Sequence, residues 1–263
     1  MTELAYGRLR PVTPLASVLL EDNPGPMTLD GTNSWLLRAP GTAACVVVDP
    51  GEDDLPHLER VAAAAGSVSL ILITHRHPDH VGGAPWLARQ TGAPVRALDP
   101  ALTVGGSPLV DGELIEAAGV RLQVVATPGH TSDSVSFLLD GPGVAPAVLT
   151  GDTVLGRGTT VIAHPDGALG PYLTSLRRLA ELAPDTVALP GHGPELPDAA
   201  AAANAYLEHR EQRLDQVRAA LATLGADASP PQVVEHVYVD VDRSLWPAAE
   251  LSVRAQLDYL RGA

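Results

Sequence analysis

Short apolar runs and amphipathic segments alternate over the first three quarters of the chain. Apolar runs that end at turn residues predict strands, and stretches with helical spacing predict the helices between them. The predicted strands cover residues 35–37, 44–49, 70–73, 120–125, 134–139, 147–150 and 186–189. The predicted helices cover residues 55–65, 84–90 and 171–183, and Gly66 and Gly92 suit the ends of the first two.

The pattern changes after residue 197, beyond which only helices are predicted. Asp198 suits the start of a long helix and Gly225 its end. Ser229 with Gln232 resembles the capping box of a second helix, and a last helix is expected over residues 247–260. We therefore expect an α/β core over residues 1–197 and a small helical C-terminal domain over residues 198–263.

The long helix of this tail is predicted to bury one apolar stripe. Its members recur at helical spacing and are Leu207, Leu214, Val217, Leu221 and Leu224. Three arginines, at positions 210, 213 and 218, are expected to lie mainly off the stripe. The tail could be a packed cap or a substrate-binding lid. A DNA-reading helix-turn-helix is disfavoured because acids and arginines are about equal in number there.

Composition changes the picture in two respects. Hydrophobic residues make up 45% of the chain but aromatic residues only 3%, so the core must consist mainly of Ala, Val and Leu. Cys45 is the single cysteine, which excludes an intrachain disulfide. We find no apolar run long enough to span a membrane and no secretory signal pattern at the N-terminus, and these features favour the cytoplasm.

The charge balance is acidic and unusual in kind. The formal net charge is −14 at pH 7, and all 17 basic residues are arginines. Such a balance disfavours a broad electrostatic grip on nucleic acid, so we expect no stable binding of duplex DNA. A local arginine patch beside a cationic metal centre remains compatible with it.

The chemistry is concentrated in six residues, 75–80, with the sequence His-Arg-His-Pro-Asp-His. They follow the predicted strand over residues 70–73, and rigid scaffolds often present reactive groups in such loops. His75 and His77 are two positions apart, so in extended backbone both face the same side. Pro78 favours a turn before Asp79 and His80. The simplest interpretation is two metal ions, one for each pair of ligands.

A catalytic zinc typically takes three protein ligands and keeps a position for water, so further ligands should follow. Three candidates each come directly after a predicted strand and are flanked by glycine, which lets the backbone approach an ion. They are His130, Asp152 and His192. Asp49, at the end of another strand, is a plausible hydrogen-bond partner for one of the imidazoles.

This set of motifs resembles the metallo-β-lactamase superfamily over residues 20–197. The resemblance implies a four-layer αββα sandwich with a metal-dependent catalytic domain. It also implies two divalent ions, zinc first and manganese or iron as alternatives. By the resemblance, the first ion is held by His75, His77 and His130, the second by Asp79, His80 and His192, and Asp152 bridges both. Water between two such ions loses a proton near neutral pH, and Asp79 is the expected catalytic residue that orients it.

Several branches of the superfamily fit poorly. The best-known zinc β-lactamases use a cysteine on the second metal, whereas Cys45 lies far upstream of the ligands. The flavodiiron branch replaces one motif histidine by glutamate, and this chain keeps His77. The β-CASP RNA-processing enzymes carry a large insertion between the positions of Asp152 and His192, which are close in this chain.

Two enzymatic functions remain. The chain resembles the β-lactamase-like branch whose animal members are mitochondrial endoribonucleases acting on single-stranded RNA. The resemblance lies in residues 23–33 and 156–161, Tyr172, Ser175 and Leu176, and Tyr206 to Arg210. That resemblance includes the small helical C-terminal domain. The alternative is a glyoxalase II-like thioesterase of the hydroxyacylglutathione hydrolase type, whose substrate is a small thioester. A non-catalytic binding module is a third hypothesis, which the complete ligand set disfavours.

Overall fold

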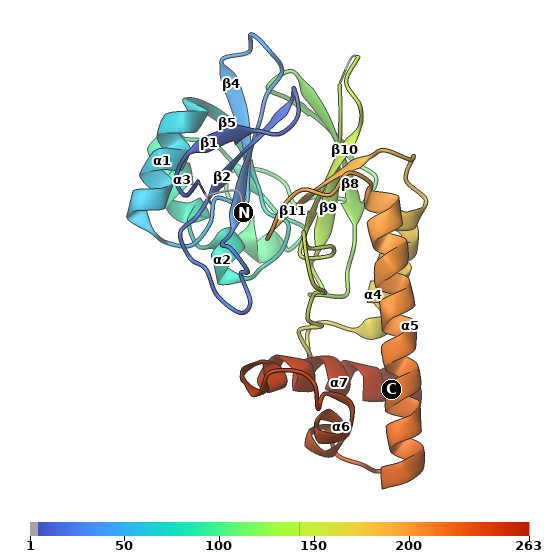
Figure 1. The fold of residues 1–263 in the computed structure, drawn as a ribbon. Helices are drawn as coiled ribbons and strands as arrows, with labels where there is room; N and C mark the ends of the chain where they lie inside the picture. The colour runs from blue at the N-terminus through green and yellow to red at the C-terminus, as the bar shows by residue number, and fades with distance from the viewer. Residues whose placement is uncertain (1–4, 142, 263) are drawn as a thin grey trace.

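Two β-sheets form the centre of the molecule in this computed structural model, which describes residues 5–141 and 143–262 (Figure 1). The first sheet has the strand order β1-β2-β3-β4-β5-β6 and the second the order β11-β10-β9-β8-β7. The strands of the first sheet are β1 (Leu9–Pro11), β2 (Ala16–Leu20), β3 (Asn33–Leu37), β4 (Ala44–Val48), β5 (Ser67–Leu72) and β6 (Val95–Arg96). Those of the second are β7 (Leu114–Ala117), β8 (Val120–Ala126), β9 (Val135–Asp140), β10 (Ala147–Gly151) and β11 (Val187–Pro190).

Helices cover the outer faces of both sheets, which confirms the expected αββα sandwich. Helices α1 (Leu55–Ala65) and α3 (Ala84–Thr91) pack on the first sheet. Helices α4 (Leu169–Ala180) and α5 (Ala199–Leu224) pack on the second. The remaining helices are α2 (Pro78–Val81), η1 (Pro100–Leu102), α6 (Pro230–Val237), η2 (Arg243–Leu245) and α7 (Trp246–Arg261).

The alternation of side chains along each strand explains why the central strands are apolar throughout. Trp35 and Leu37 of β3 point into the layer between the sheets, where Phe137 of β9 is fully buried. Leu36, between them, points outward against α1 and α3. Because both faces of such a strand are covered, nearly every position must be apolar.

Four strands escaped the sequence prediction. Strands β1, β6 and β7 lie at the edges of their sheets, and all three residues of β1 are exposed. An edge strand packs little apolar surface, so it carries no clear apolar pattern. Strand β2 is buried at three of its five positions and was simply not recognised.

The C-terminal helices have the predicted ends. The Asp198 side chain accepts a hydrogen bond from Ala201 N at 2.9 Å, Gly225 directly follows α5, and Ser229 N donates to Gln232 Oε1 at 2.9 Å. The long helix α5 runs from the second sheet to α6 and α7 (Figure 1). Its two halves belong to different apolar clusters, so the division at residue 198 stays a prediction.

The predicted stripe of α5 needs correction. Leu214 and Val217 are buried as expected, but Leu224 is exposed, and Arg210, placed off the stripe from sequence, is only 4% exposed.

Across residues 5–141 and 143–262, no helix is both long and apolar enough to cross a membrane.

A buried carboxyl group supports the loop after β4. Glu21 is 2% exposed, and its carboxylate oxygens lie 3.2 and 3.3 Å from the donor Glu52 N. Gly51 has φ 97°, and a Cβ there would lie 2.5 Å from Glu21 Oε2, so only glycine fits. Burial raises the pKa of Glu21 to about 7, the hydrogen bond from Glu52 N opposes this, and the carboxylate of Glu52 adds to it.

Glu21→Gln should flatten the pH dependence of stability. The folded state prefers the protonated carboxyl, so this contribution is complete below the unfolded pKa of 4.5 and is lost as pH rises through about 7. In metal-free wild type, the free energy of unfolding should therefore fall by about 3 kcal/mol more over this range than in the variant. Urea unfolding at several pH values measures this, and parallel curves for both proteins would contradict it.

Candidate metal centre

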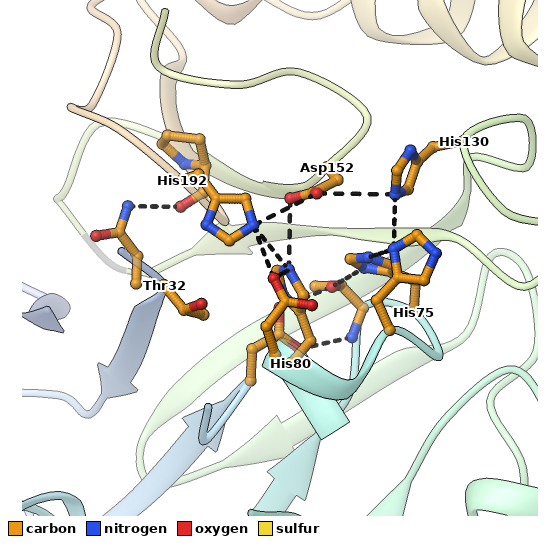
Figure 2. Close-up of polar contacts among 12 residues, drawn as sticks. Thr32, His75, His80, His130, Asp152 and His192 are labelled. Atoms are coloured by element: carbon orange, nitrogen blue, oxygen red, sulfur yellow. Dashed lines mark hydrogen bonds and ion pairs between the residues drawn. The ribbon is translucent and has the colours of Figure 1, made fainter. Parts of the chain in front are cut away.

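The seven predicted ligands meet at one end of the sandwich, where strands of both sheets terminate (Figure 2). Strand β5 leads into His75 and His77, and helix α2 carries Asp79 and His80. Three further residues follow strands of the second sheet, namely His130 after β8, Asp152 after β10 and His192 after β11. Parallel or neighbouring strands deliver their ends to one edge, which is why residues far apart in sequence converge here.

Four of the residues form a first cluster, His75, His77, His130 and Asp152. His77 Nδ1 lies 3.0 Å from His75 Nε2 and 3.0 Å from His130 Nε2. A tetrahedral ion with Zn–N bonds of about 2.05 Å separates its nitrogen ligands by roughly 3.3 Å. The three nitrogens are thus spaced to bind one ion.

Asp79, His80 and His192 form a second cluster. His192 Nε2 lies 3.2 Å from His80 Nε2 and 3.1 Å from Asp79 Oδ2. Asp152 lies between the clusters, with its oxygens 3.5 Å from His80 Nε2, 3.5 Å from His192 Nε2 and 3.7 Å from His130 Nε2 (Figure 2). This is the position that a bridging carboxylate requires.

Outward hydrogen bonds set the tautomers of four imidazoles. His80 Nδ1 donates to Asp49 Oδ2 at 2.9 Å, His130 Nδ1 to Val161 O at 2.6 Å, and His192 Nδ1 to Gly31 O at 3.1 Å. His75 Nδ1 lies 3.0 Å from Thr74 Oγ1, which itself donates to Asp49. With the outer nitrogens protonated, the inner nitrogens present lone pairs to the centre.

Converging lone pairs repel one another unless a cation lies between them. Asp152 Oδ1 is also buried without a hydrogen-bond partner in the described part of the chain, which is costly for a carboxylate. A Cβ on Gly191 would lie 2.7 Å from Asp152 Oδ1 and 2.7 Å from His80 Cε1, so the backbone itself forms one wall. The donor set and its surroundings therefore fit two divalent ions.

The protonation equilibria differ between the clusters. Burial lowers the pKa of His75 well below its usual value and that of His77 to about 4, which keeps both ready to bind metal. Burial also acts to lower the pKa of His192, but Asp152 and Asp79 outweigh it and raise the pKa to about 11. The carboxylates of Asp152 and Asp79 thus favour positive charge around His192, and either a proton or a metal ion can provide it.

Asp49 is the expected hydrogen-bond partner of the imidazoles, and the structure confirms it. Its Oδ1 accepts from Thr74 N at 2.8 Å, and its Oδ2 accepts from Thr74 Oγ1 at 2.7 Å and from His80 Nδ1 at 2.9 Å. One buried carboxylate thus orients His80 directly and His75 through Thr74, which connects the two clusters.

The C-terminal helices reach the first cluster through the segment that holds His130. Thr160 Oγ1 lies 3.1 Å from His130 Nδ1, and Arg210 of α5 donates to the carbonyl oxygen of Thr160. Ile162 N also donates to Ser252 Oγ of α7 at 3.3 Å. The position of His130 therefore depends on residues outside the sandwich.

Sequence reasoning did not assign these supporting roles, although Thr160 and Arg210 lie in segments that it singled out. A signal for Arg210 was present, because it lies midway between Tyr206 and Leu214 at intervals of four, on the buried side of α5. Thr160 and Ser252 carry no such signal, since their partners lie far away in the chain.

A cavity of about 330 Å³ opens beside the first cluster. His130 and Asp152 form part of its wall, and the loop over residues 23–33 contributes Pro26, Met27 and Leu29. Arg157 to Val161 form another side, and α5, α7 and the segment between α6 and α7 close the cavity. Both segments singled out from sequence, residues 23–33 and 156–161, thus line the cavity.

Comparison with known proteins agrees with this geometry. Residues 27–192 match the metallo-beta-lactamase superfamily, and residues 229–261 match the beta-lactamase associated winged helix domain. The chain belongs to the metallo-β-lactamase superfamily. The winged-helix match covers α6 and α7, which the sequence predicted only as helices.

Individual relatives extend the likeness over most of the chain. A "Beta-lactamase-like protein 2 homolog" of Drosophila melanogaster is 30% identical over 262 residues, 92% of this chain and 86% of that protein. "Lactamase-like protein adaB" of Aspergillus niger is 35% identical over 80% of this chain, and the match spans 65% of the Aspergillus protein. A metallo-beta-lactamase family protein of Thermus thermophilus superposes with a TM-score of 0.78 at 26% identity, covering 95% of this chain and 94% of that one.

Asp49→Asn should weaken metal binding at the second cluster. The loss of one carboxylate that orients a ligand typically lowers metal affinity about 10- to 100-fold. Competition with a chromophoric chelator measures this, with Asp53→Asn as the matched control because Asp53 is exposed. Equal affinities for the two variants would show that Asp49 does not support the site.

Arg210→Met should lower metal affinity at the first cluster by about tenfold, because Thr160 and then His130 lose their fixed positions. Arg218→Met is the control, since Arg218 lies on the same helix and pairs with exposed Asp215. Competition with a chromophoric chelator measures the metal affinity, and thermal unfolding of the metal-free proteins measures their stability. A loss of stability without any change in metal affinity would limit Arg210 to a packing role.

Proposed function

We propose that this protein is a dinuclear metal-dependent hydrolase that cleaves phosphodiester bonds in single-stranded RNA. The main support is the double cluster of inward-facing ligands, two of which, His130 and Asp152, lie in the wall of a cavity. His75, His77 and His130 would hold one ion, Asp79, His80 and His192 the other, and Asp152 both. Zinc suits these nitrogen and oxygen ligands, and manganese or iron are alternatives.

Two bound divalent ions would lower the pKa of a water molecule at the site and so supply a nucleophile near neutral pH. The chain's own residues provide its orientation. The Asp79 side chain is 19% exposed, against 8% for Asp152, so Asp79 is the carboxylate better able to accept a hydrogen bond from that water. His192 Nε2 lies 3.1 Å from Asp79 Oδ2, so both side chains would bind the same ion, and that ion would keep this carboxylate in place.

The choice of RNA rests on charge and on resemblance. Arg210 and Arg213 lie around the cavity, together with Arg157, which pairs with Asp30, whereas Asp152 is the only carboxylate that the described residues place in its wall. An acidic chain thus presents a locally basic surface beside the metal centre, which suits an anionic substrate. The resemblance of residues 23–33 and 156–161 to the endoribonuclease branch points the same way.

A thioesterase of the glyoxalase II type is the second candidate, and a different observation favours it. The cavity wall includes apolar residues, Met27 and Leu29 from one loop, Val241 and Leu245 between α6 and α7, and Ala248 of α7. Such a wall suits an acyl group better than a ribose-phosphate chain.

Two assays on the metal-loaded protein separate these functions, one with a fluorescent single-stranded RNA and one with S-lactoylglutathione. We expect cleavage of the RNA. Hydrolysis of the thioester alone would refute the nuclease proposal, and no activity on either, with two ions bound, would contradict both.

Asp79→Ala should abolish turnover while leaving the protein folded, because the nucleophile loses its orienting carboxylate and the second ion a ligand. His80→Ala should behave alike. His236→Ala is the control for histidine removal, since His236 is exposed on α6. Circular dichroism and metal content are measured with the rates, and wild-type turnover in Asp79→Ala would remove Asp79 from the mechanism.

A further inference from the structure

Two residues of the cavity wall each carry a buried nitrogen atom without a hydrogen-bond partner among the residues that the structure describes. His209 Nε2 and Arg210 Nε have no hydrogen bond within the described residues, and both side chains belong to the wall. Unsatisfied buried donors are rare because each costs free energy that a hydrogen bond would recover. A ligand that supplies acceptor oxygens would remove this cost.

The arginines here also lack acidic partners. Arg157, which also lines the cavity, is paired with Asp30, but neither Arg210 nor Arg213 forms an ion pair with a carboxylate in residues 5–141 and 143–262. The Arg213 guanidinium instead lies 4.3 Å from the centroid of the Tyr238 ring and donates to Gln216 Oε1 at 2.8 Å. Both guanidinium groups thus carry charge that no carboxylate among the described residues of the cavity wall pairs with.

Metal binding would increase this excess of positive charge at the cavity. Asp152 is the sole carboxylate in the cavity wall among the residues that the structure describes, and it faces the ligand clusters. If Asp152 binds metal ions, no other acidic residue described in the wall balances the positive charge of Arg210 and Arg213. Burial, together with these two arginines, lowers the pKa of His209, so the imidazole does not add charge but can donate a hydrogen bond.

We propose that His209, Arg210 and Arg213 bind a phosphate group of the RNA strand that flanks the scissile phosphodiester. This inference rests on the proposed function and assigns a second contact to the substrate, beside the metal centre. The site supplies what phosphate oxygens prefer, guanidinium N–H groups in a partly desolvated position. It also gives the C-terminal helices a role in substrate selection, because all three residues belong to α5.

Fluorescent trinucleotide RNAs with a neutral methylphosphonate at one linkage test the subsite. Each retains one cleavable phosphodiester, and the neutral linkage lies on its 5′ side in one substrate and on its 3′ side in the other. For metal-loaded wild type, one of them should have a KM about tenfold above that of the all-phosphate trinucleotide, with kcat little changed.

Variants then assign the effect to α5. Arg213→Gln and His209→Gln should each raise KM for the all-phosphate RNA. The ratio of the KM of the affected methylphosphonate RNA to that of the all-phosphate RNA should then fall close to 1. Arg218→Gln, on the same helix and away from the cavity wall, should keep the wild-type ratio. Arg210 is left intact because it also holds Thr160, and metal content is measured for every variant.

The outcomes separate this inference from the proposed function. RNA cleavage with equal KM values for all three trinucleotides would refute the subsite alone, as would a wild-type ratio in both variants. No cleavage of any RNA would refute the proposed function, and the phosphate assignment with it. If S-lactoylglutathione is then hydrolysed, and the variants raise its KM but not that of its dimethyl ester, the bound anion is a carboxylate.

Discussion

Mutual repulsion among ligands that face one another is the constraint on which this structure depends. Five imidazoles and the carboxylate of Asp152 are forced together at the ends of strands from both sheets, with nitrogen atoms only 3.0 to 3.2 Å apart. Such an arrangement is unfavourable by itself and becomes favourable when cations occupy the centre. The sandwich must therefore be rigid enough to hold it, and its fully buried core of Val, Leu and Phe137 provides that rigidity.

The rigidity is transmitted through a set of hydrogen bonds behind the ligands. Asp49 connects β4 to the loop after β5 and orients imidazoles of both clusters. Backbone carbonyls of Gly31 and Val161 hold His192 and His130 from other parts of the chain. Because ligand orientation determines metal affinity, the loops that supply these carbonyls are part of the metal centre in energetic terms.

The C-terminal helices contribute on two levels. Arg210 and Ser252 hold the segment that orients His130, and residues of α5 and α7 form the wall of the cavity. The acidic surface of the chain and its basic cavity are compatible, since charge far from the site is screened while buried groups beside it are not. The match of residues 229–261 to a winged helix domain thus concerns helices that here help to form a cavity at the catalytic edge.

The amino-acid sequence by itself determined most of the central strands, β2 excepted, the ends of α5 and the ligand types. Residues such as Trp35 to Leu37 are covered on both faces, so their burial is visible as an apolar run, and Asp198 and Gly225 act through local hydrogen bonds and backbone geometry. The ligands were recognisable because their chemistry requires particular residue types directly after strands.

Only the tertiary structure decided what lies behind and beside those ligands. The edge strands β1 and β7 leave no clear pattern because they bury little surface. Arg210 was misplaced because a charged residue is usually exposed, and its burial depends on Thr160 and Tyr172, which approach only in the folded chain. The cavity, and the lack of partners for His209 Nε2 and Arg210 Nε among the described residues, arise from distances between segments far apart in sequence, and no local pattern encodes such distances.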